Sequence, residues 1–169
     1  MSKILSFDMG KINTAFALTE EGRLIKCGTV KRPISDLTDK NFNSQKMRFI
    51  TEIKELMEDL SKDDAVVVER FQMRQFNSGA QIELISVMLG LIASQSPCAV
   101  YPVTAATWKN SYLNTYGENT MEAFFNDAYS EHECDAIGLG LWYFEKETQK
   151  KSAFLKKFHG STPVVHRQT

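Results

Sequence analysis

Two acidic side chains stand at points where apolar runs of the sequence end. Asp8 follows the run that begins at Ile4, and Glu69 follows three consecutive valines. A carboxylate at the inner end of an apolar strand is costly unless it binds a cation or accepts strong hydrogen bonds. For either acid alone, a solvated strand end is the simpler interpretation.

A third acidic segment, Glu131-His-Glu-Cys-Asp135, makes the combination more informative. His132 and Asp135 are three residues apart, so on a helix they share one face. If that face is directed toward the two strand ends, four side chains that can bind a metal ion converge. We call these residues, Asp8, Glu69, His132 and Asp135, the acid cluster. Carboxylates with one imidazole suit Mg²⁺ or Mn²⁺. Two such ions about 4 Å apart can hold a phosphodiester, activate water and stabilise the leaving oxygen.

The fourth member of the acid cluster has competitors in its own segment. Glu133 lies about 200° around the helix from Asp135, which argues against it. Glu131 lies one turn before Asp135 and remains a second choice to His132. A histidine at a helix start can also simply cap the helix or lie exposed.

Hydrophobic patterns predict the elements that must position these residues. Short runs rich in β-branched or alternating residues predict strands over residues 3–10, 13–19, 23–31, 65–69 and 99–103. Apolar residues at helical spacing predict helices over residues 44–62, 78–95, 104–113, 121–130 and 132–150. Ser44 is the expected N-cap of the first helix, and Pro102 restricts the last strand to an edge or terminal position.

This order predicts an α/β fold with one mixed five-stranded sheet. Three antiparallel strands come first, then helix and strand alternate, and helices flank the sheet. The helix at 78–95 carries apolar residues well beyond a single stripe. It therefore needs a second packing partner besides the sheet, either a second subunit or the C-terminal helix.

Composition supports one globular domain followed by a basic tail. With 169 residues and 43% hydrophobic content, the chain can bury a substantial core, and we assign residues 1–150 to that domain. From Glu145 to Thr169 there are six Lys or Arg residues against two Glu, in a chain of net charge −1. The basic tail, residues 151–169, is either a phosphate-binding segment or a solvated terminus. We expect a cytoplasmic protein without a membrane span or signal peptide.

The ordered set of Asp8, Glu69 and His-x-x-Asp-Ala resembles the RuvC-type Holliday-junction resolvases of the RNase H-like nuclease superfamily. The segment after Glu69, Arg70-Phe-Gln-Met-Arg-Gln-Phe-Asn-Ser-Gly, resembles the loop that enters the junction in that family. The resemblance gives candidate DNA contacts at Phe71, Arg74, Phe76 and Lys109. It also implies that the helix at 78–95 pairs two subunits. Met9 stands where the family usually has proline, and no second lysine follows Lys109 in the expected place.

The resemblance implies a homodimeric, Mg²⁺- or Mn²⁺-dependent endonuclease that nicks a four-way DNA junction symmetrically, with two ions in each active site. Asp8, Glu69, His132 and Asp135 would be its metal ligands, and Lys109 would stabilise charge on the phosphate. Arg70, Lys150 and Lys151 would add sequence-independent affinity for the DNA backbone. Two alternatives stay open: a nuclease of the same fold acting on flaps, other branched DNA or RNA, and a non-catalytic nucleic-acid-binding module. A viral or organellar origin is a further hypothesis.

Overall fold

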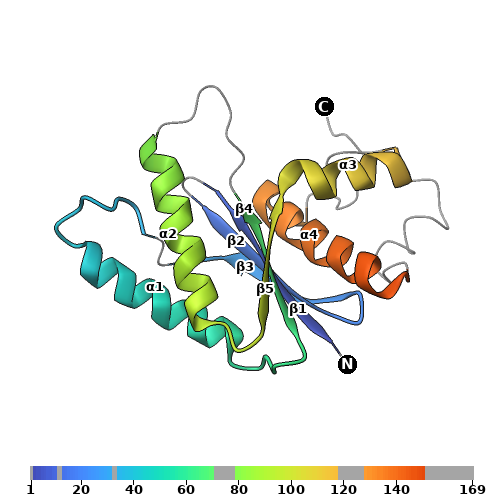
Figure 1. The fold of residues 1–169 in the computed structure, drawn as a ribbon, viewed down its shortest axis with the longest axis horizontal. Coiled ribbons are helices and arrows are strands. Elements are labelled where there is room, and N and C mark those ends of the chain that lie inside the picture. The colour runs from blue at the N-terminus through green and yellow to red at the C-terminus, as the bar shows by residue number, and fades with distance from the viewer. Residues whose placement is uncertain (1, 11–12, 32–33, 71–78, 118–127, 151–169) are drawn as a thin grey trace.

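The computed structural model describes residues 2–10, 13–31, 34–70, 79–117 and 128–150. Within these ranges the chain forms five strands and four helices around one sheet (Figure 1). In chain order the elements are β1 (Lys3–Met9), β2 (Thr14–Glu20), β3 (Arg23–Thr29), α1 (Phe42–Met57), β4 (Ala65–Arg70), α2 (Gly79–Gln95), β5 (Ala99–Thr104), α3 (Ala105–Tyr116) and α4 (Glu131–Thr148).

The sheet is mixed, with the strand order β3-β2-β1-β4-β5. β2 is antiparallel to both of its neighbours, β1 and β3, whereas β4 runs parallel to both of its neighbours, β1 and β5. The predicted five-stranded sheet of three antiparallel strands and then alternating helix and strand is therefore confirmed. β5, which contains Pro102, is an edge strand, where the missing backbone N–H is tolerated.

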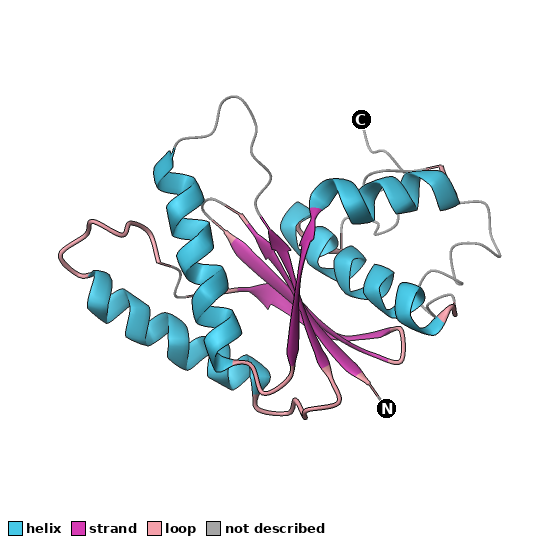
Figure 2. Ribbon diagram, in the orientation of Figure 1, coloured by secondary structure: helices cyan, strands magenta, loops and turns pink. Residues whose placement is uncertain are grey.

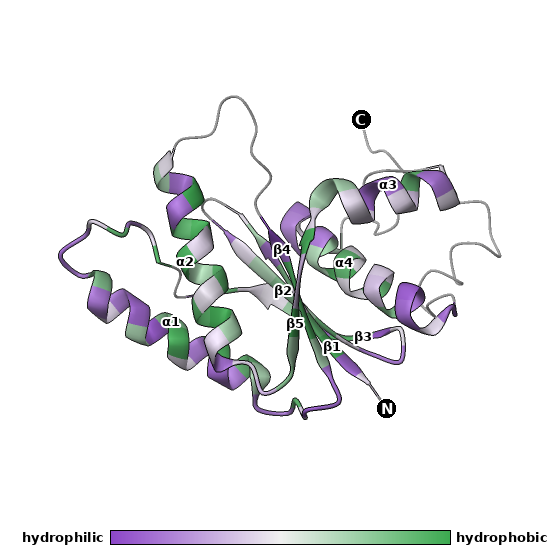
Figure 3. Ribbon diagram, in the orientation of Figure 1, coloured by the Kyte–Doolittle hydropathy of each residue, from purple (hydrophilic) through white to green (hydrophobic). Residues whose placement is uncertain are grey.

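Two helices cover each face of the sheet, α1 and α2 on one side and α3 and α4 on the other (Figures 1 and 2). Alternation along β1 divides the core accordingly. Leu5 and Phe7 pack in the cluster beneath α1 and α2, whereas Ile4 packs in the cluster beneath α4. Hydrophobic and hydrophilic positions alternate along the helices (Figure 3), and apolar helix residues such as Ile53, Ile92 and Ile137 belong to the two core clusters. None of the helices in the described ranges is both long and apolar enough to cross a lipid bilayer.

α2 packs against α1 and the sheet, and it lies on the opposite side of the sheet from α4 (Figure 1). The alternative that the C-terminal helix buries α2 is therefore wrong. Leu84, Ile85, Met88 and Ile92 form its buried stripe, and Val87 and Leu91 remain partly exposed. A second subunit stays a prediction for that outer surface.

The boundaries of α1 differ from the predicted residues 44–62. The helix begins at Phe42 with Asn41 in the N-cap position, because Asp39 accepts the Asn41 N–H and turns the chain before Ser44. It ends at Met57 because Asp64 accepts hydrogen bonds from the Ser61 backbone and hydroxyl, which folds the next residues into a turn. Local polar side chains therefore override the hydrophobic pattern at both ends.

The remaining helices also shift at their ends. α3 uses Thr104 as its N-cap and continues to Tyr116, where Gly117 adopts a left-handed φ of 75° that ends it. Residues 121–127 of the predicted helix at 121–130 lie outside the described ranges, and Tyr129 and Ser130 belong to a turn before α4 rather than to a helix. The basic tail at 151–169 also lies outside them.

Candidate active site

The central pair of parallel strands positions the first two acids. β1 and β4 pair in register, with Phe7 opposite Val68. Asp8 and Glu69 are the next residues along these strands, so the parallel pairing brings both to the same edge of the sheet. Asp8 is only 4% exposed, and the Glu69 side chain is partly buried.

The start of α4 brings the other two members to this edge. Ser130 and Glu133 form a capping box: the Ser130 hydroxyl accepts the Glu133 N–H at 3.3 Å, and the Glu133 carboxylate accepts the Ser130 N–H at 3.0 Å. With the first turn fixed in this way, His132 Nδ1 lies 2.8 Å from Asp8 Oδ2. The Glu133 carboxylate is thus engaged in the cap, and Glu131 is exposed.

Small residues let α4 lie close to β1. The buried Ser6 hydroxyl donates to the Ala136 carbonyl at 2.6 Å. A Cβ on Gly140 would lie 2.8 Å from the same hydroxyl oxygen. His132, Ala136 and Gly140 follow one another at four-residue intervals, so this face of the helix continues into the acid cluster.

Gly10 permits a similarly close approach next to Asp8. A Cβ at this position would lie 2.2 Å from the Asn13 carbonyl oxygen and 3.3 Å from Cε1 of His132. A side chain at position 10 would therefore displace the Asn13 backbone and also crowd the His132 ring.

α3 places a positively charged side chain, Lys109, next to the acid cluster. It begins directly after β5, which is parallel to β4, so its first turn lies at the same edge of the sheet. Lys109 Nζ donates to Asp135 Oδ2 at 2.6 Å, and it also lies 5.1 Å from the centroid of the Trp108 ring. The predicted phosphate contact Lys109 is therefore adjacent to the acid cluster, where it neutralises part of its charge.

Burial and mutual repulsion disfavour ionisation of the carboxylates. Burial, with a further contribution from the charge of Asp8, raises the pKa of Glu69 to about 7. Burial also raises the pKa of Asp8, an effect that the His132 hydrogen bond opposes and the charge of Asp135 reinforces. The pKa of Asp135 is raised by burial as well, although the Lys109 hydrogen bond pulls it down.

The donor chemistry of the acid cluster fits a hard divalent cation, although the described residues contain no ready-made metal site. Each carboxylate is instead hydrogen-bonded to another side chain: Asp8 to His132, Glu69 to the Trp108 N–H, and Asp135 to the Lys109 ammonium. Three carboxylates whose charges repel one another, together with an imidazole, are the ligand set that Mg²⁺ or Mn²⁺ accepts. A cation here would relieve the repulsion that raises their pKa values.

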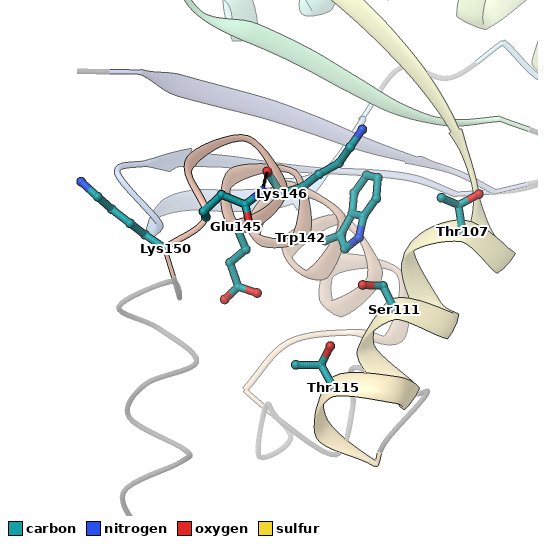
Figure 4. Close-up of a pocket in the computed structure, with 8 residues that line it drawn as sticks. Thr107, Ser111, Thr115, Trp142, Glu145, Lys146 and Lys150 are labelled. Atoms are coloured by element: carbon teal, nitrogen blue, oxygen red, sulfur yellow. Dashed lines mark hydrogen bonds between the residues drawn. The ribbon is translucent and has the colours of Figure 1, made fainter.

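Of the other predicted DNA contacts, Arg70 and Lys150 are among the described residues. Arg70 is exposed at the end of β4, directly after Glu69. Lys150 lines a groove of about 470 Å³ between α3 and α4, together with Trp142 and three hydroxyl side chains of α3 (Figure 4). The predicted contacts Phe71, Arg74, Phe76 and Lys151 lie outside the described residues.

Sequence reasoning did not identify Trp108 or Ser6. Trp108 Nε1 donates to Glu69 Oε2 at 2.9 Å, and Ser6 anchors α4 on β1. Two signals could have pointed to them. Ser6 is a polar residue inside an apolar strand two positions before Asp8, and Trp108 directly precedes Lys109.

Comparison with solved structures identifies the architecture. A Thermus thermophilus RuvC in complex with a Holliday junction substrate superposes with a TM-score of 0.63 at 16% identity, covering 87% of this chain and 96% of that chain. The chain has a RuvC-like fold. A second T. thermophilus RuvC structure agrees, with a TM-score of 0.61 at 15% identity and the same coverage. No protein-family model matches the sequence, and no curated protein is detectably similar to it. The RuvC-like fold confirms the predicted RNase H-like sheet flanked by helices.

Proposed function

We propose that this protein is a structure-specific DNA endonuclease that resolves four-way junctions by divalent-cation-dependent hydrolysis. The observation that carries the proposal is the convergence of Asp8, Glu69 and Asp135, from three separate elements, on one edge of a RuvC-like sheet. A solved protein of the same fold was captured on a Holliday junction, which supports branched DNA as the substrate class.

The acid cluster would hold two Mg²⁺ or Mn²⁺ ions. Bound there, the ions would supply Lewis-acid activation of water and stabilisation of the leaving 3′ oxygen. Asp8 and Asp135 would bind one or both of the ions. Glu69 would complete the ligands of the first ion, and His132 would be a ligand of the second. In the neutral tautomer whose Nδ1–H donates to Asp8, the lone pair of the His132 ring is on Nε2, which orients the imidazole as a ligand.

Lys109 would change partner during the reaction. Its ammonium is bonded to Asp135, but a cation bound by Asp135 would weaken that ion pair. The freed ammonium would then stabilise the negative charge that develops on the scissile phosphate. Stacking over Trp108 keeps Lys109 near the acid cluster in either state.

Sequence-independent affinity for DNA would come from basic residues around this edge. Arg70 and Lys150 are exposed among the described residues, and we also propose Phe71, Arg74, Phe76 and Lys151 as contacts. Backbone contacts of this kind make binding fall steeply with salt concentration.

A cleavage assay tests the proposal directly. Purified protein with Mg²⁺ is incubated with a labelled four-way junction, a flap, a linear duplex and an RNA–DNA hybrid, and we expect paired symmetric nicks in the junction. Asp8→Asn should slow the cleavage roughly a thousandfold, equivalent to about 4 kcal/mol of transition-state stabilisation. Asp63→Asn, an equal charge change at an exposed turn, should cut at the wild-type rate.

Other results of this assay would contradict the proposal. Cleavage of only the flap or the hybrid would favour a nuclease with a different substrate. Tight junction binding without cleavage would favour a non-catalytic binding module. An Asp8→Asn variant as fast as the wild type would show that the acid cluster is not the active site.

The proposed enzyme acts as a homodimer through α2, since two symmetric nicks need two sites related by a two-fold axis. Gly90 is exposed on α2, and a Cβ there would contact nothing within 4 Å. Gly90→Arg should therefore fold normally but place a charge in the interface. Light scattering should give a dimer for the wild type and a monomer for the variant. A monomeric wild type would overturn this part of the proposal.

A further inference from the structure

Trp108 is buried, and its polar atom is turned to the acid cluster. The side chain is 0% exposed and lies in the core beneath α4, where the ring packs edge-on against Tyr112 with centroids 5.9 Å apart. A buried indole N–H needs a hydrogen-bond acceptor. Here the acceptor is Oε2 of Glu69, at 2.9 Å.

We propose that Trp108 is a positioning residue that fixes the Glu69 carboxylate for cation binding. Its N–H engages Oε2, which leaves Oε1 as the oxygen that a cation can bind. The inference rests on the proposed function only in assigning the cation a role in DNA cleavage. The hydrogen bond and the burial that support it are properties of the fold itself.

Glu69 needs such a partner because of its neighbours. It stands near the end of β4 on a side chain with several rotatable bonds, and the negative charge of Asp8 acts against it. Without a fixed donor, rotation would carry the carboxylate away from that charge and from the position where both acids can share a cation. A ligand held in its binding geometry loses less conformational entropy when the cation arrives.

The chemistry of the donor suits this role. An indole N–H is a neutral donor, so it orients the carboxylate without adding a positive charge that would compete with the cation. The ring itself is locked by core packing on α3. Hydrogen bonds from neighbouring residues to metal-binding side chains orient those ligands and tune metal sites in many proteins.

The face of the same ring serves a second member of the site. Lys109 Nζ lies 5.1 Å from the Trp108 ring centroid, within cation–π range. The edge of the indole therefore binds Glu69 from β4 while its face restrains the ammonium that is paired with Asp135. One rigid side chain thus fixes the Glu69 carboxylate and the Lys109 ammonium relative to each other.

Mn²⁺ binding to the DNA-free protein tests the proposal, measured by calorimetry or electron paramagnetic resonance. Trp108→Phe keeps an aromatic ring but removes the N–H, and we expect it to weaken Mn²⁺ binding about tenfold or more. Tyr112→Phe is the matched control. It lies on the same helix and removes the buried hydroxyl that donates to Gly138 at 3.2 Å, so it should leave Mn²⁺ affinity within about twofold of wild type.

A double-mutant cycle separates positioning from general damage. In a Glu69→Gln background, Trp108→Phe should cause no further loss of Mn²⁺ affinity, because its target carboxylate is already gone. An equal loss in both backgrounds, or wild-type affinity in Trp108→Phe, would overturn the proposal. If Trp108→Phe does not fold, a benzothiophene analogue of tryptophan at position 108 keeps the ring shape without the N–H. It should show the same loss.

The same measurements distinguish this inference from the proposed function. If wild type binds Mn²⁺ with an affinity that depends on Trp108 and Glu69 but leaves every DNA substrate intact, the nuclease function is refuted and the positioning role of Trp108 is kept. If the protein cleaves the junction but Trp108→Phe leaves its Mn²⁺ affinity unchanged, the positioning role is refuted and the nuclease function is kept. A wild-type protein without measurable Mn²⁺ affinity would refute both.

Discussion

At the residue scale, the acid cluster places charges where the fold itself disfavours them. Asp8 and Glu69 lie side by side at the end of two central strands, and both have raised pKa values, with burial as the main cause. The Lys109 ammonium offsets only part of this charge, and His132 adds a hydrogen bond to Asp8. Such unfavourable electrostatics are characteristic of sites that bind a ligand.

The raised pKa of Glu69 predicts how the stability of the cation-free protein depends on pH. Between its ordinary value of 4.5 and about 7, the folded protein keeps the proton that the unfolded chain has lost. This contribution favours folding at low pH and is lost as the pH rises through 7, by about 3 kcal/mol at most. Urea unfolding in a chelator should therefore show wild type losing stability relative to Glu69→Gln across this range. A constant difference between the two proteins would contradict the assignment.

Sequence reasoning identified the acidic residues of the site but not their partners. Asp8 and Glu69 were detectable because a charge ending an apolar run is conspicuous. Trp108 was not, because an aromatic on a helix is usually a core residue and only its three-dimensional placement reveals the acceptor of its N–H. Hydrogen-bond partners distant in sequence cannot be derived from periodicity.

At the element scale, the contact between β1 and α4 sets the geometry of the acid cluster. Ser6 and Asp8 are two residues apart and lie on the same side of β1, the side that faces α4. Ser6 hydrogen-bonds Ala136 of that helix, and Asp8 hydrogen-bonds His132. Gly140 extends this contact one turn farther along α4. The distance between Asp8 and His132 therefore depends on how closely the small residues allow the helix to approach.

The effect of Gly140→Ala on the free energy of unfolding should change sign when Ser6 is replaced by alanine. In wild type, the new Cβ would lie 2.8 Å from the buried Ser6 hydroxyl, so the overpacking should outweigh the gain in helix propensity and destabilise the protein by about 1 kcal/mol. In a Ser6→Ala background the obstructing oxygen is absent, and the same change should stabilise by up to about 1 kcal/mol. Denaturant unfolding of the four proteins measures this. Equal effects in both backgrounds would show that the contact does not limit the helix.

The elements themselves were predictable, and their ends were not. Every predicted strand is present, because alternation and β-branched runs reflect which faces are buried. The predicted ends of α1 were wrong because Asp39 and Asp64 accept hydrogen bonds from nearby backbone N–H groups. These bonds compete with helix formation, and the spacing of hydrophobic residues gives no sign of them. The partner of α2 was left open because an apolar face does not specify what covers it.

At the scale of the whole molecule, the acid cluster joins the middle of the sheet to the helices on one of its faces. β1 and β4 supply Asp8 and Glu69, α4 supplies His132 and Asp135, and α3 contacts the cluster through Lys109 and Trp108. A cation that binds only the folded arrangement therefore stabilises all four elements together.

Divalent cations should consequently raise the melting temperature of the protein. At a concentration about 100 times the dissociation constant, binding contributes about 2.7 kcal/mol, which for a domain of this size corresponds to roughly 5–10 °C. Asp135→Asn should lose most of this increase, because it removes one ligand charge. Calorimetry with and without Mn²⁺ measures both proteins. Equal shifts in the two would place the cation elsewhere.

The hydrogen bond between Asp8 and His132 joins residues 124 positions apart in the chain. Ribosomes release the N-terminal residues first, so β1 and its aspartate are available long before α4 has been synthesised. A partly synthesised chain can pair its early strands, but it has neither the histidine nor the second aspartate of the acid cluster. The proposed nuclease would therefore remain inactive during its own translation and acquire its complete site only when α4 docks on β1.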